Sequence, residues 1–301
     1  MPQTVELRDA WLPAGLPARV ELAAVPFFPQ DEYQCGPAAL ATVLANAGVT
    51  ITPADLVPQV YLPARQGSLQ VEMLAAARRN GLVSYTLPPT YTALLRELAA
   101  GTPVIVLQNL GIFSGWHYAV AVGYDFEAGE LFLRSGETAR KVMNFGMQEF
   151  FWRRGGYWSM VALPPGRIPV SAEEGRWLDS LLAFEKQGNQ QKNVLNFSAF
   201  LQRWPDNTTA AIGLANAHYA LGELGAAEGV LREAARRDPA SVPVLNNLAQ
   251  TLSDLGRNAE ALPIIERAAA QPGRYAEEVG KTRETILQRL NAAKDAGRAP
   301  R

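Results

Sequence analysis

The sequence predicts a two-part protein, in which an α+β domain is followed by an all-α domain of helical repeats. Before about residue 165, stretches rich in aromatic and β-branched residues alternate with helical ones. After it, Ala and Leu dominate and the strand patterns disappear. The second half also repeats itself, since Gly188, Gly222 and Gly256 recur at intervals of 34 residues. A chain of 301 residues is long enough for two such domains.

Helices open the α+β part. Apolar residues recur on one face of residues 37–47, which predicts a helix there. Ser68 is the expected cap of a second helix that reaches about residue 80, and Thr90 or Thr92 starts a third. Strand-forming residues and the turns between them then predict an antiparallel sheet from segments 104–107, 117–124, 131–134 and 157–163. Helices followed by such a sheet are typical of an α+β domain.

A proline-rich segment separates the two halves. Residues 163–169 read Leu-Pro-Pro-Gly-Arg-Ile-Pro, and prolines at this density interrupt both helices and central strands. We therefore expect five parts along the chain: an N-terminal extension (1–21), the α+β domain (22–164), a linker (165–170), the helical domain with its capping helix (171–294) and a tail (295–301).

The period of the second half indicates the type of repeat. A small residue at the middle turn, Ala at the close helix contact and Pro at the end of each unit resemble the tetratricopeptide repeat. Helix pairs are expected at residues 171–205, 207–239 and 240–273, and a solvating helix at 275–293. Because stacked repeats form extended concave surfaces, we expect a protein partner or a peptide substrate to bind there.

Composition and charge exclude several classes of protein. The 28 Lys and Arg residues nearly balance the 29 Asp and Glu residues, and this net charge of −1 disfavours a nucleic-acid partner. No apolar run approaches the roughly 20 residues that a transmembrane segment needs, and residues 1–24 lack an apolar signal core. One Cys and two His permit neither an internal disulfide nor a four-ligand Cys/His zinc site, and we expect no cofactor.

The single cysteine, Cys35, begins the first predicted helix, with Gly36 and Pro37 in its first turn. The free N–H groups and partial positive charge of a helix N-terminus stabilise a thiolate, and the same N–H groups can receive an oxyanion. The alternative is a small buried hydrophobe, which is the usual state of a free Cys. Packing alone, however, explains neither the Gly-Pro that follows Cys35 nor the polar residues that precede it.

His117 opens a strongly apolar strand, 82 residues after Cys35. A His in such a strand is costly unless it is hydrogen-bonded or used, and a nucleophilic Cys needs a base from elsewhere in the fold. The pair would lie at the seam between the helical half and the sheet half, with Trp116 beside the cleft. A structural, hydrogen-bonded role for His117 is the alternative, and His218, in the repeats, is expected to be structural.

These residues together carry a resemblance. The pattern Gln-x4-Cys-Gly-Pro at a helix start, followed about 80 residues later by Gly-Trp-His-Tyr-Ala-Val on a strand, resembles the papain-like cysteine peptidases that process bacteriocin double-glycine leaders, and their stand-alone relatives. The resemblance covers about residues 22–164. It implies that Cys35 is the nucleophile, that His117 acts as general base and then acid, and that Gln30 donates to the oxyanion, with Gly36 and Trp116 at the substrate cleft.

The chain departs from that family at two points. The family usually places an Asp or Asn at the end of the strand after the His strand, where this sequence has Ser135. Ser135 is the first candidate for the residue that orients the His, on topology. Asp125 is the second, on charge, although it also suits a hairpin turn, and Glu137 is a further possibility. Gln30 stands five positions before the Cys, where six is common, so Gln34 remains an alternative.

The sequence therefore predicts a cysteine peptidase that hydrolyses a peptide bond, with repeats that bind its substrate or a partner protein. One alternative is a catalytically weak papain-like domain that serves as a binding scaffold. Another is amide or thioester transfer, because the acyl-enzyme is shared and only the acceptor differs. The resemblance also implies a bacterial protein that is exported or membrane-tethered, if a signal segment has been removed.

Overall fold

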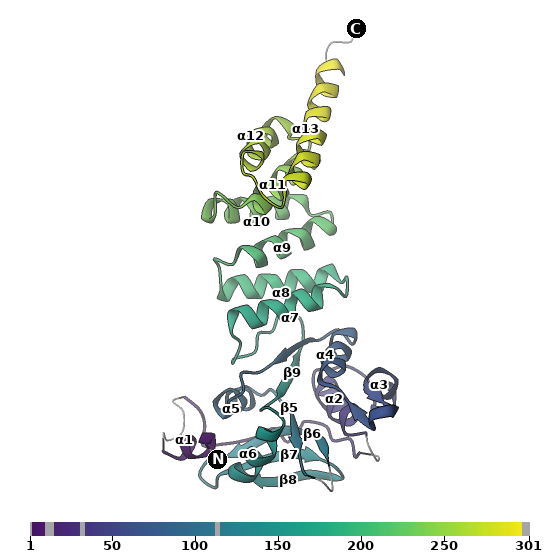
Figure 1. Ribbon diagram of the computed structural model, residues 1–301, viewed down its shortest axis with the longest axis vertical. Helices are drawn as coiled ribbons and strands as arrows, with labels where there is room; N and C mark the ends of the chain where they lie inside the picture. The colour runs from purple at the N-terminus through teal and green to yellow at the C-terminus, as the bar shows by residue number, and fades with distance from the viewer. Residues whose placement is uncertain (1, 10–14, 31–33, 112–114, 297–301) are drawn as a thin grey trace. The chain divides into compact units, whose positions relative to one another are not determined.

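The structure of the chain is a computed structural model. It divides the chain into two compact units, Met1–Gln187 and Gly188–Arg301, and each is described by itself. The first unit is α+β with an antiparallel sheet and the second is all-helical, as predicted (Figure 1). The boundary between the units falls after residue 187 and not in the linker expected at 165–170. The residues described are 2–9, 15–30, 34–111 and 115–296.

The elements of the first unit can be followed by their labels in Figure 1. In chain order they are α1 (Pro2–Asp9), β1 (Arg19–Glu21), α2 (Cys35–Asn46), α3 (Pro53–Val60), β2 (Tyr61–Leu62), a 3-10 turn (Pro63–Arg65), β3 (Gly67–Ser68), α4 (Gln70–Arg79), β4 (Val83–Thr86), α5 (Tyr91–Ala99), β5 (Val104–Asn109), β6 (Trp116–Asp125), β7 (Glu130–Ser135), β8 (Thr138–Asn144), α6 (Phe145–Arg154), β9 (Ser159–Leu163) and α7 (Glu174–Glu185).

One antiparallel sheet organises this unit. Its strands lie in the order β4-β9-β5-β6-β7-β8, and β1 pairs with the end of β6. Leu40 of α2 is fully buried in the same core as Ile105 of β5 and Val120 of β6. Successive strand residues point to opposite faces, so these two residues lie on the face of the sheet that α2 covers. α6 also contacts β5, where the buried side-chain amide of Gln108 donates to Gln148. Figure 1 shows α2, α3 and α4 grouped together on one side of the sheet.

Ser68 does not cap a helix, contrary to the sequence prediction. It is the last residue of β3 and pairs with Tyr61 of β2, and α4 begins at Gln70. Ser is found in turns and other non-helical segments as well as at helix caps, and here its backbone pairs with a neighbouring strand. Thr90 caps α5 as predicted, because its hydroxyl accepts a hydrogen bond from the backbone N–H of Ala93.

A buried carboxylate helps to tie the N-terminal extension to the rest of the unit. Glu149 of α6 accepts hydrogen bonds from the backbone N–H groups of Gln3, at 3.1 Å, and Thr4, at 2.8 Å. The first N–H groups of a helix have no partner within it, and an acidic group there is also favoured by the helix dipole. The extension therefore contributes α1 and, through β1, a strand of the sheet.

α7 packs against the rest of the first unit. Trp177 is buried, and its ring meets that of Tyr85 of β4 edge to face, with 5.6 Å between centroids. The Tyr85 hydroxyl accepts from the backbone N–H of Glu173 at 3.1 Å, and Ser171 donates through its hydroxyl to the buried Glu97 at 2.6 Å. These contacts explain why the first unit extends through α7.

The second unit repeats its turn geometry with the period of its sequence. Gly188, Gly222 and Gly256 have φ angles of 77°, 77° and 78°, and this left-handed conformation favours glycine. The positions that recur between helices are buried: Phe197, Leu231 and Ile265 at one, and Phe200, Ala234 and Ala268 at another. The helices of this unit are α8 (Gln190–Arg203), α9 (Thr208–Ala220), α10 (Leu224–Arg237), α11 (Val242–Asp254), α12 (Asn258–Ala269) and α13 (Ala276–Ala296).

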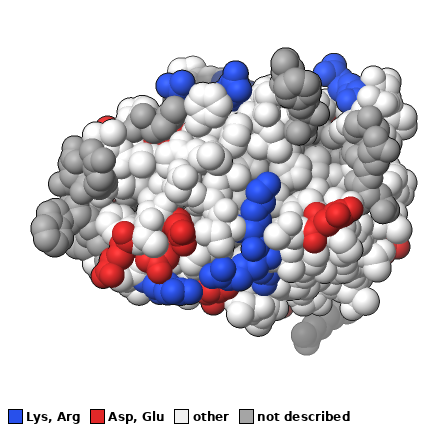
Figure 2. Space-filling view, turned by 90° about the horizontal axis from the view of Figure 1, so that it is seen from below, with Lys and Arg blue, Asp and Glu red and all other residues white. Residues whose placement is uncertain are grey.

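Charge on the surface is mixed in sign. The face seen in Figure 2 carries acidic and basic side chains beside one another along its lower part and further basic ones at its upper edge, in line with the near-zero net charge. Among the helices that the structure describes, none is both long enough and apolar enough to span a membrane.

Candidate active site

Cys35 is the first residue of α2, and its thiol is half-buried. The next residue, Gly36, is buried, and a Cβ added there would lie 2.2 Å from the hydroxyl oxygen of Ser68 and 2.6 Å from its Cβ. Such distances are not possible between real atoms, so the close approach of β3 to the first turn of α2 requires glycine at position 36. The hairpin of β2 and β3 therefore fixes the turn that carries the thiol.

Burial raises the pKa of the Cys35 thiol. Backbone hydrogen bonds with Tyr118, Gly36 and Cys35 itself lower it, but burial has the larger effect. The sequence led us to expect a stabilised thiolate at this helix N-terminus. The donors are present, but desolvation favours the neutral thiol more strongly than they favour the anion.

His117 lies near the start of β6, and its Nε2 is 2.9 Å from the hydroxyl oxygen of Ser135. Ser135 is the last residue of β7, the strand beside β6, and is buried. Burial, with a smaller contribution from the positive charge of Lys141, lowers the pKa of His117 to about 4. The imidazole is therefore neutral near pH 7, and its Ser135 partner adds no charge that would oppose this.

Gln30 lies at the end of the same two strands. Its side-chain amide nitrogen donates to the carbonyl oxygen of Tyr118 at 3.4 Å, and its backbone N–H donates to the carbonyl of Gly136 at 3.3 Å. β7 ends at Ser135 and does not pair with Tyr118. The backbone of Tyr118 is therefore bonded instead by the side chains of Gln30 and Cys35. Four of the residues that the sequence indicated thus lie at the start of β6: Cys35, His117, Ser135 and Gln30.

Both parts of the chain match known families. Residues 22–136 match the model of the Peptidase_C39 like family, a range that contains Cys35, His117 and Ser135. Residues 209–251 and 244–270 match two models of the tetratricopeptide repeat. The chain joins a C39-like peptidase domain to tetratricopeptide repeats. No sequence among the curated proteins matches it.

Solved structures resemble each part of the chain. A protein from Bacillus anthracis described as a C39-like peptidase is 17% identical and overlaps 48% of this chain and 97% of its own, with a TM-score of 0.41. A double glycine motif protease from an AMS/PCAT transporter, solved with the leader peptide, is 20% identical over 47% of this chain and 93% of its own, with a TM-score of 0.37. The repeats resemble the Sgt2 TPR domain from Aspergillus fumigatus, 18% identical over 42% and 85%, with a TM-score of 0.39.

Asp125 lies at the other end of β6 from His117 in the C39-like domain. The two are eight positions apart along the strand, or roughly 26 Å at about 3.3 Å per residue. Its carboxylate accepts from the backbone N–H of Ala128 at 3.0 Å and pairs with Arg19 at 3.3 Å. Asp125 therefore holds the hairpin turn and cannot orient His117, which corrects the prediction that made it the second candidate on charge. Glu137 is exposed in the turn after Ser135.

Trp116 and Gln34 belong to the C39-like domain, whereas His218 belongs to the repeats. Trp116 is 59% exposed beside His117, where a cleft residue is expected. Gln34 directly precedes α2, and its side chain does not cap the helix. His218 belongs to the repeat unit and contacts Glu223 through Nδ1 at 2.6 Å.

Sequence reasoning missed three contributors to the C39-like site: Tyr118, Ser68 and Lys141. Tyr118 acts through its backbone, and its hydroxyl donates to the carbonyl of Ser68 at 3.2 Å. Main-chain donors leave no mark in a sequence, although Tyr118 is the neighbour of His117. The positive charge of Lys141 helps to lower the pKa of His117 from β8, a strand that the sequence did not predict. Within the described residues, no group of three or more His, Cys, Asp or Glu side chains is arranged to hold a metal ion.

Proposed function

We propose that the C39-like domain is a cysteine peptidase in which Cys35 is the nucleophile and His117 the general base and acid. One observation carries the proposal: Cys35 and Gln30 both contact the backbone of Tyr118, directly beside a histidine whose Nε2 is held by Ser135. A nucleophile, a base, an orienting group and an amide donor at one point are the parts that acyl transfer requires. The repeats bind a protein partner or the substrate.

The proton begins on the thiol in this mechanism. Burial favours neutral Cys35 and neutral His117, so the thiol proton passes to the imidazole as sulfur attacks the peptide carbonyl. The side-chain amide of Gln30 and the N–H of Cys35 stabilise the oxyanion. The imidazolium then protonates the leaving amine, and water attacks the thioester with His117 as base, which releases the acid and regenerates the thiol.

Ser135 sets the tautomer in this scheme. If Nε2–H of His117 donates to the Ser135 hydroxyl oxygen, the lone pair of Nδ1 is free to accept the thiol proton. A hydroxyl stabilises the imidazolium less than a carboxylate does, so a slower acylation step is expected than with an Asp at this position.

Covalent trapping tests the proposal without knowledge of the substrate. The full-length protein is incubated with a library of peptides that carry electrophilic carbonyl groups, and the modified residue is located by mass spectrometry. We expect selective labelling of Cys35 that is abolished by Cys35→Ala and greatly slowed by His117→Ala. His218→Ala is the matched control, because it removes the other histidine and should change nothing. Equal labelling of the protein and of its His117→Ala variant would argue against a peptidase.

A catalytically weak domain that serves as a binding scaffold is the second candidate. It is favoured by the neutral Ser135 beside His117 and by the burial that raises the pKa of the Cys35 thiol. This candidate expects peptides to bind reversibly, with no faster reaction of Cys35 than of the unfolded chain. Amide or thioester transfer would show instead as trapping of Cys35 followed by transfer of the acyl group to an added amine.

A further inference from the structure

Lys141 is a half-buried lysine on the same face of the sheet as His117. It lies on β8 two residues before Met143, so the side chains of Lys141 and Met143 share a face of the sheet. The sulfur of Met143 is 3.9 Å from the side-chain amide nitrogen of Gln108, and Gln108 of β5 pairs with His117 of β6. Paired residues of neighbouring strands also share a face, so Lys141 and His117 point to the same side of the sheet.

Lys141 is close enough to His117 to act on its imidazole. Leu133 of β7 lies opposite Lys141, and Ser135 is two residues further along β7. Diagonal neighbours of this kind are roughly 7–8 Å apart, within the reach of a long side chain. Ser135 contacts the imidazole of His117 directly. Burial has the largest effect on the pKa of His117, and the positive charge of Lys141 lowers this pKa further.

The ammonium group of Lys141 has no partner. In the part of the chain that the structure describes, it forms neither a hydrogen bond nor an ion pair. The neighbouring cations are engaged: Arg140 pairs with Glu21 at 2.6 Å, and Arg134 donates to three backbone carbonyl groups. Glu137, the acidic residue nearest to Lys141 in the sequence, does not pair with it. The charge of Lys141 is therefore available to a ligand.

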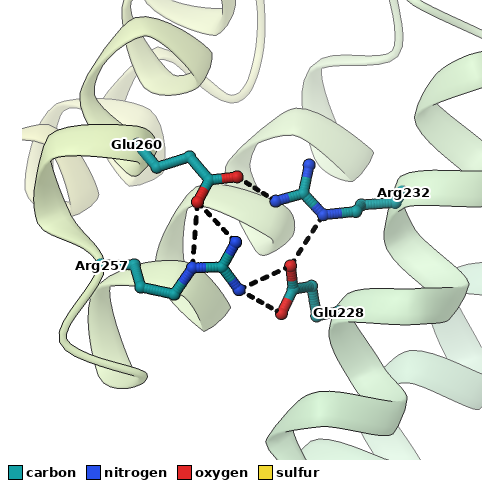
Figure 3. A network of polar contacts seen from close by, with 4 residues as sticks. All are labelled: Glu228, Arg232, Arg257 and Glu260. Carbon is teal, nitrogen blue, oxygen red and sulfur yellow. Dashed lines mark hydrogen bonds and ion pairs between the residues drawn. The ribbon is translucent and has the colours of Figure 1, made fainter.

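Arginines of the repeat unit show the opposite arrangement, in which cations and carboxylates balance one another. Arg232 lies 2.7 Å from a carboxylate oxygen of Glu228 and also bonds to Glu260. Arg257 bonds to the same two carboxylates, which closes the network (Figure 3). A half-buried cation without such a counter-ion is unfavourable, because burying a charge costs free energy unless the charge is paired. A local conflict of this kind at Lys141 indicates a functional position.

The charge of Lys141 also opposes the proposed reaction. His117 becomes an imidazolium when it takes the thiol proton, and a second cation on the same face raises the free energy of that state. A carboxylate bound to Lys141 removes this repulsion. The imidazolium then gives its proton to the leaving amine, so the leaving part of the substrate lies on the His117 side of Cys35. A carboxylate in the leaving part is therefore the one that can meet Lys141.

We propose that Lys141 is a specificity residue whose ammonium group binds a carboxylate in the leaving part of the peptide substrate. The carboxylate belongs either to an acidic side chain or to the free C-terminus of the substrate. The inference rests on the proposed peptidase function and names a class of substrate for it. Because the carboxylate balances the charge beside His117, it accelerates acylation as well as binding.

Four peptide α-ketoamides test this site in the full-length protein. Their ketone adds the Cys35 thiol reversibly, and their amide nitrogen carries one residue of the leaving side: glutamate amide, alanine with a free carboxylate, alanine amide or lysine amide. We expect at least one of the two carboxylate probes to react about tenfold faster than the alanine amide, the worth of one charged hydrogen bond. The faster of the two identifies the source of the carboxylate. Equal reaction of all four probes overturns the proposal.

Variants of Lys141 locate the effect. Lys141→Met should abolish the preference for a carboxylate and speed the reaction of the alanine amide, because it removes the repulsion of the imidazolium. Lys141→Glu should reverse the preference in favour of the lysine amide. Lys186→Met makes the same change of charge at an exposed lysine and should keep the original preference. A Lys141→Met variant that keeps the preference, or that reacts more slowly with the alanine amide, overturns the proposal.

NMR titration of His117 separates this inference from the peptidase proposal. The dipeptide Glu-Ala, which carries both kinds of carboxylate, should raise the pKa of His117 in the unmodified protein and in Cys35→Ala, but not in Lys141→Met. If no probe reacts with Cys35 but this shift is present, the carboxylate site is upheld and the peptidase is contradicted. If Cys35 reacts with the probes but shows neither preference nor shift, the peptidase stands and the role of Lys141 is overturned.

Discussion

The imidazole Nε2 of His117 lies 2.9 Å from the hydroxyl oxygen of Ser135, and the two residues stand on neighbouring strands of one sheet. A neutral hydroxyl thus occupies a position next to a histidine that burial keeps neutral. The contact fixes the ring without adding the charge that would stabilise an imidazolium. The reactivity expected of Cys35 and His117 depends on this neutral partner.

Replacement of Ser135 should change both the ring orientation and its basicity. We expect Ser135→Ala to slow the labelling of Cys35 by about tenfold, the worth of one hydrogen bond. Ser135→Asp should raise the pKa of His117, because a carboxylate stabilises the imidazolium, and should speed labelling near pH 7. NMR titration of the imidazole and labelling rates measure the two effects. Ser159→Ala, another buried serine, is the control. An unshifted His117 pKa in Ser135→Asp would contradict the contact.

The reactivity of Cys35 should depend on pH in a direction set by burial. Because desolvation raises the pKa of the thiol, the midpoint of its alkylation should lie above the ordinary value of about 8.5 and return to it in denaturant. Peptide hydrolysis should persist on the acid side until His117 is protonated near pH 4, since the neutral imidazole is the base. Alkylation rates and activity profiles across pH test both statements. A midpoint well below 8.5 in the folded protein would instead indicate a thiolate–imidazolium pair.

The first turn of α2 should not tolerate a side chain at position 36. Gly36→Ala places a Cβ against Ser68, and we expect it to destabilise the chain by about 1–3 kcal/mol and to displace the thiol. Adding Ser68→Gly removes both atoms that clash and should restore much of the stability and the Cys35 reactivity. Gly146→Ala is a control, because its nearest contact would be an ordinary 3.6 Å. Urea unfolding with labelling rates provides the measurement, and failure of the second substitution to rescue would refute this packing.

α7 should stabilise the first unit through Trp177. Truncation of this buried ring to Ala should cost about 3–5 kcal/mol of unfolding free energy, because the cavity beside Tyr85 cannot close completely. Trp116→Ala removes an exposed ring of the same kind and should leave stability nearly unchanged. Unfolding in urea followed by circular dichroism compares the two. Similar losses in both variants would mean that α7 does not belong to the core of this unit.

The two-part order of the fold was readable in the sequence because it is set by local patterns. Apolar periodicity predicted α2 and the strands around His117, and the recurring glycines predicted the repeat turns, where all three adopt the same left-handed φ. Ser68 was misplaced, since the same residue type suits a helix cap and a strand end, and only pairing with Tyr61 decides between them. The strand β8, with Lys141, carries too few apolar residues to be recognised.

The sequence by itself reduced the candidate nucleophile and base to Cys35 and His117, because the chain holds one Cys and only two His. It also put Ser135 at the end of the strand after the His strand. Only the tertiary structure decided that Ser135, and not Asp125, meets the imidazole, because two ends of one strand cannot reach the same ring. It likewise decided the charge of the Cys35 thiol. Burial is a property of everything packed around a group, and no motif of neighbouring residues encodes it.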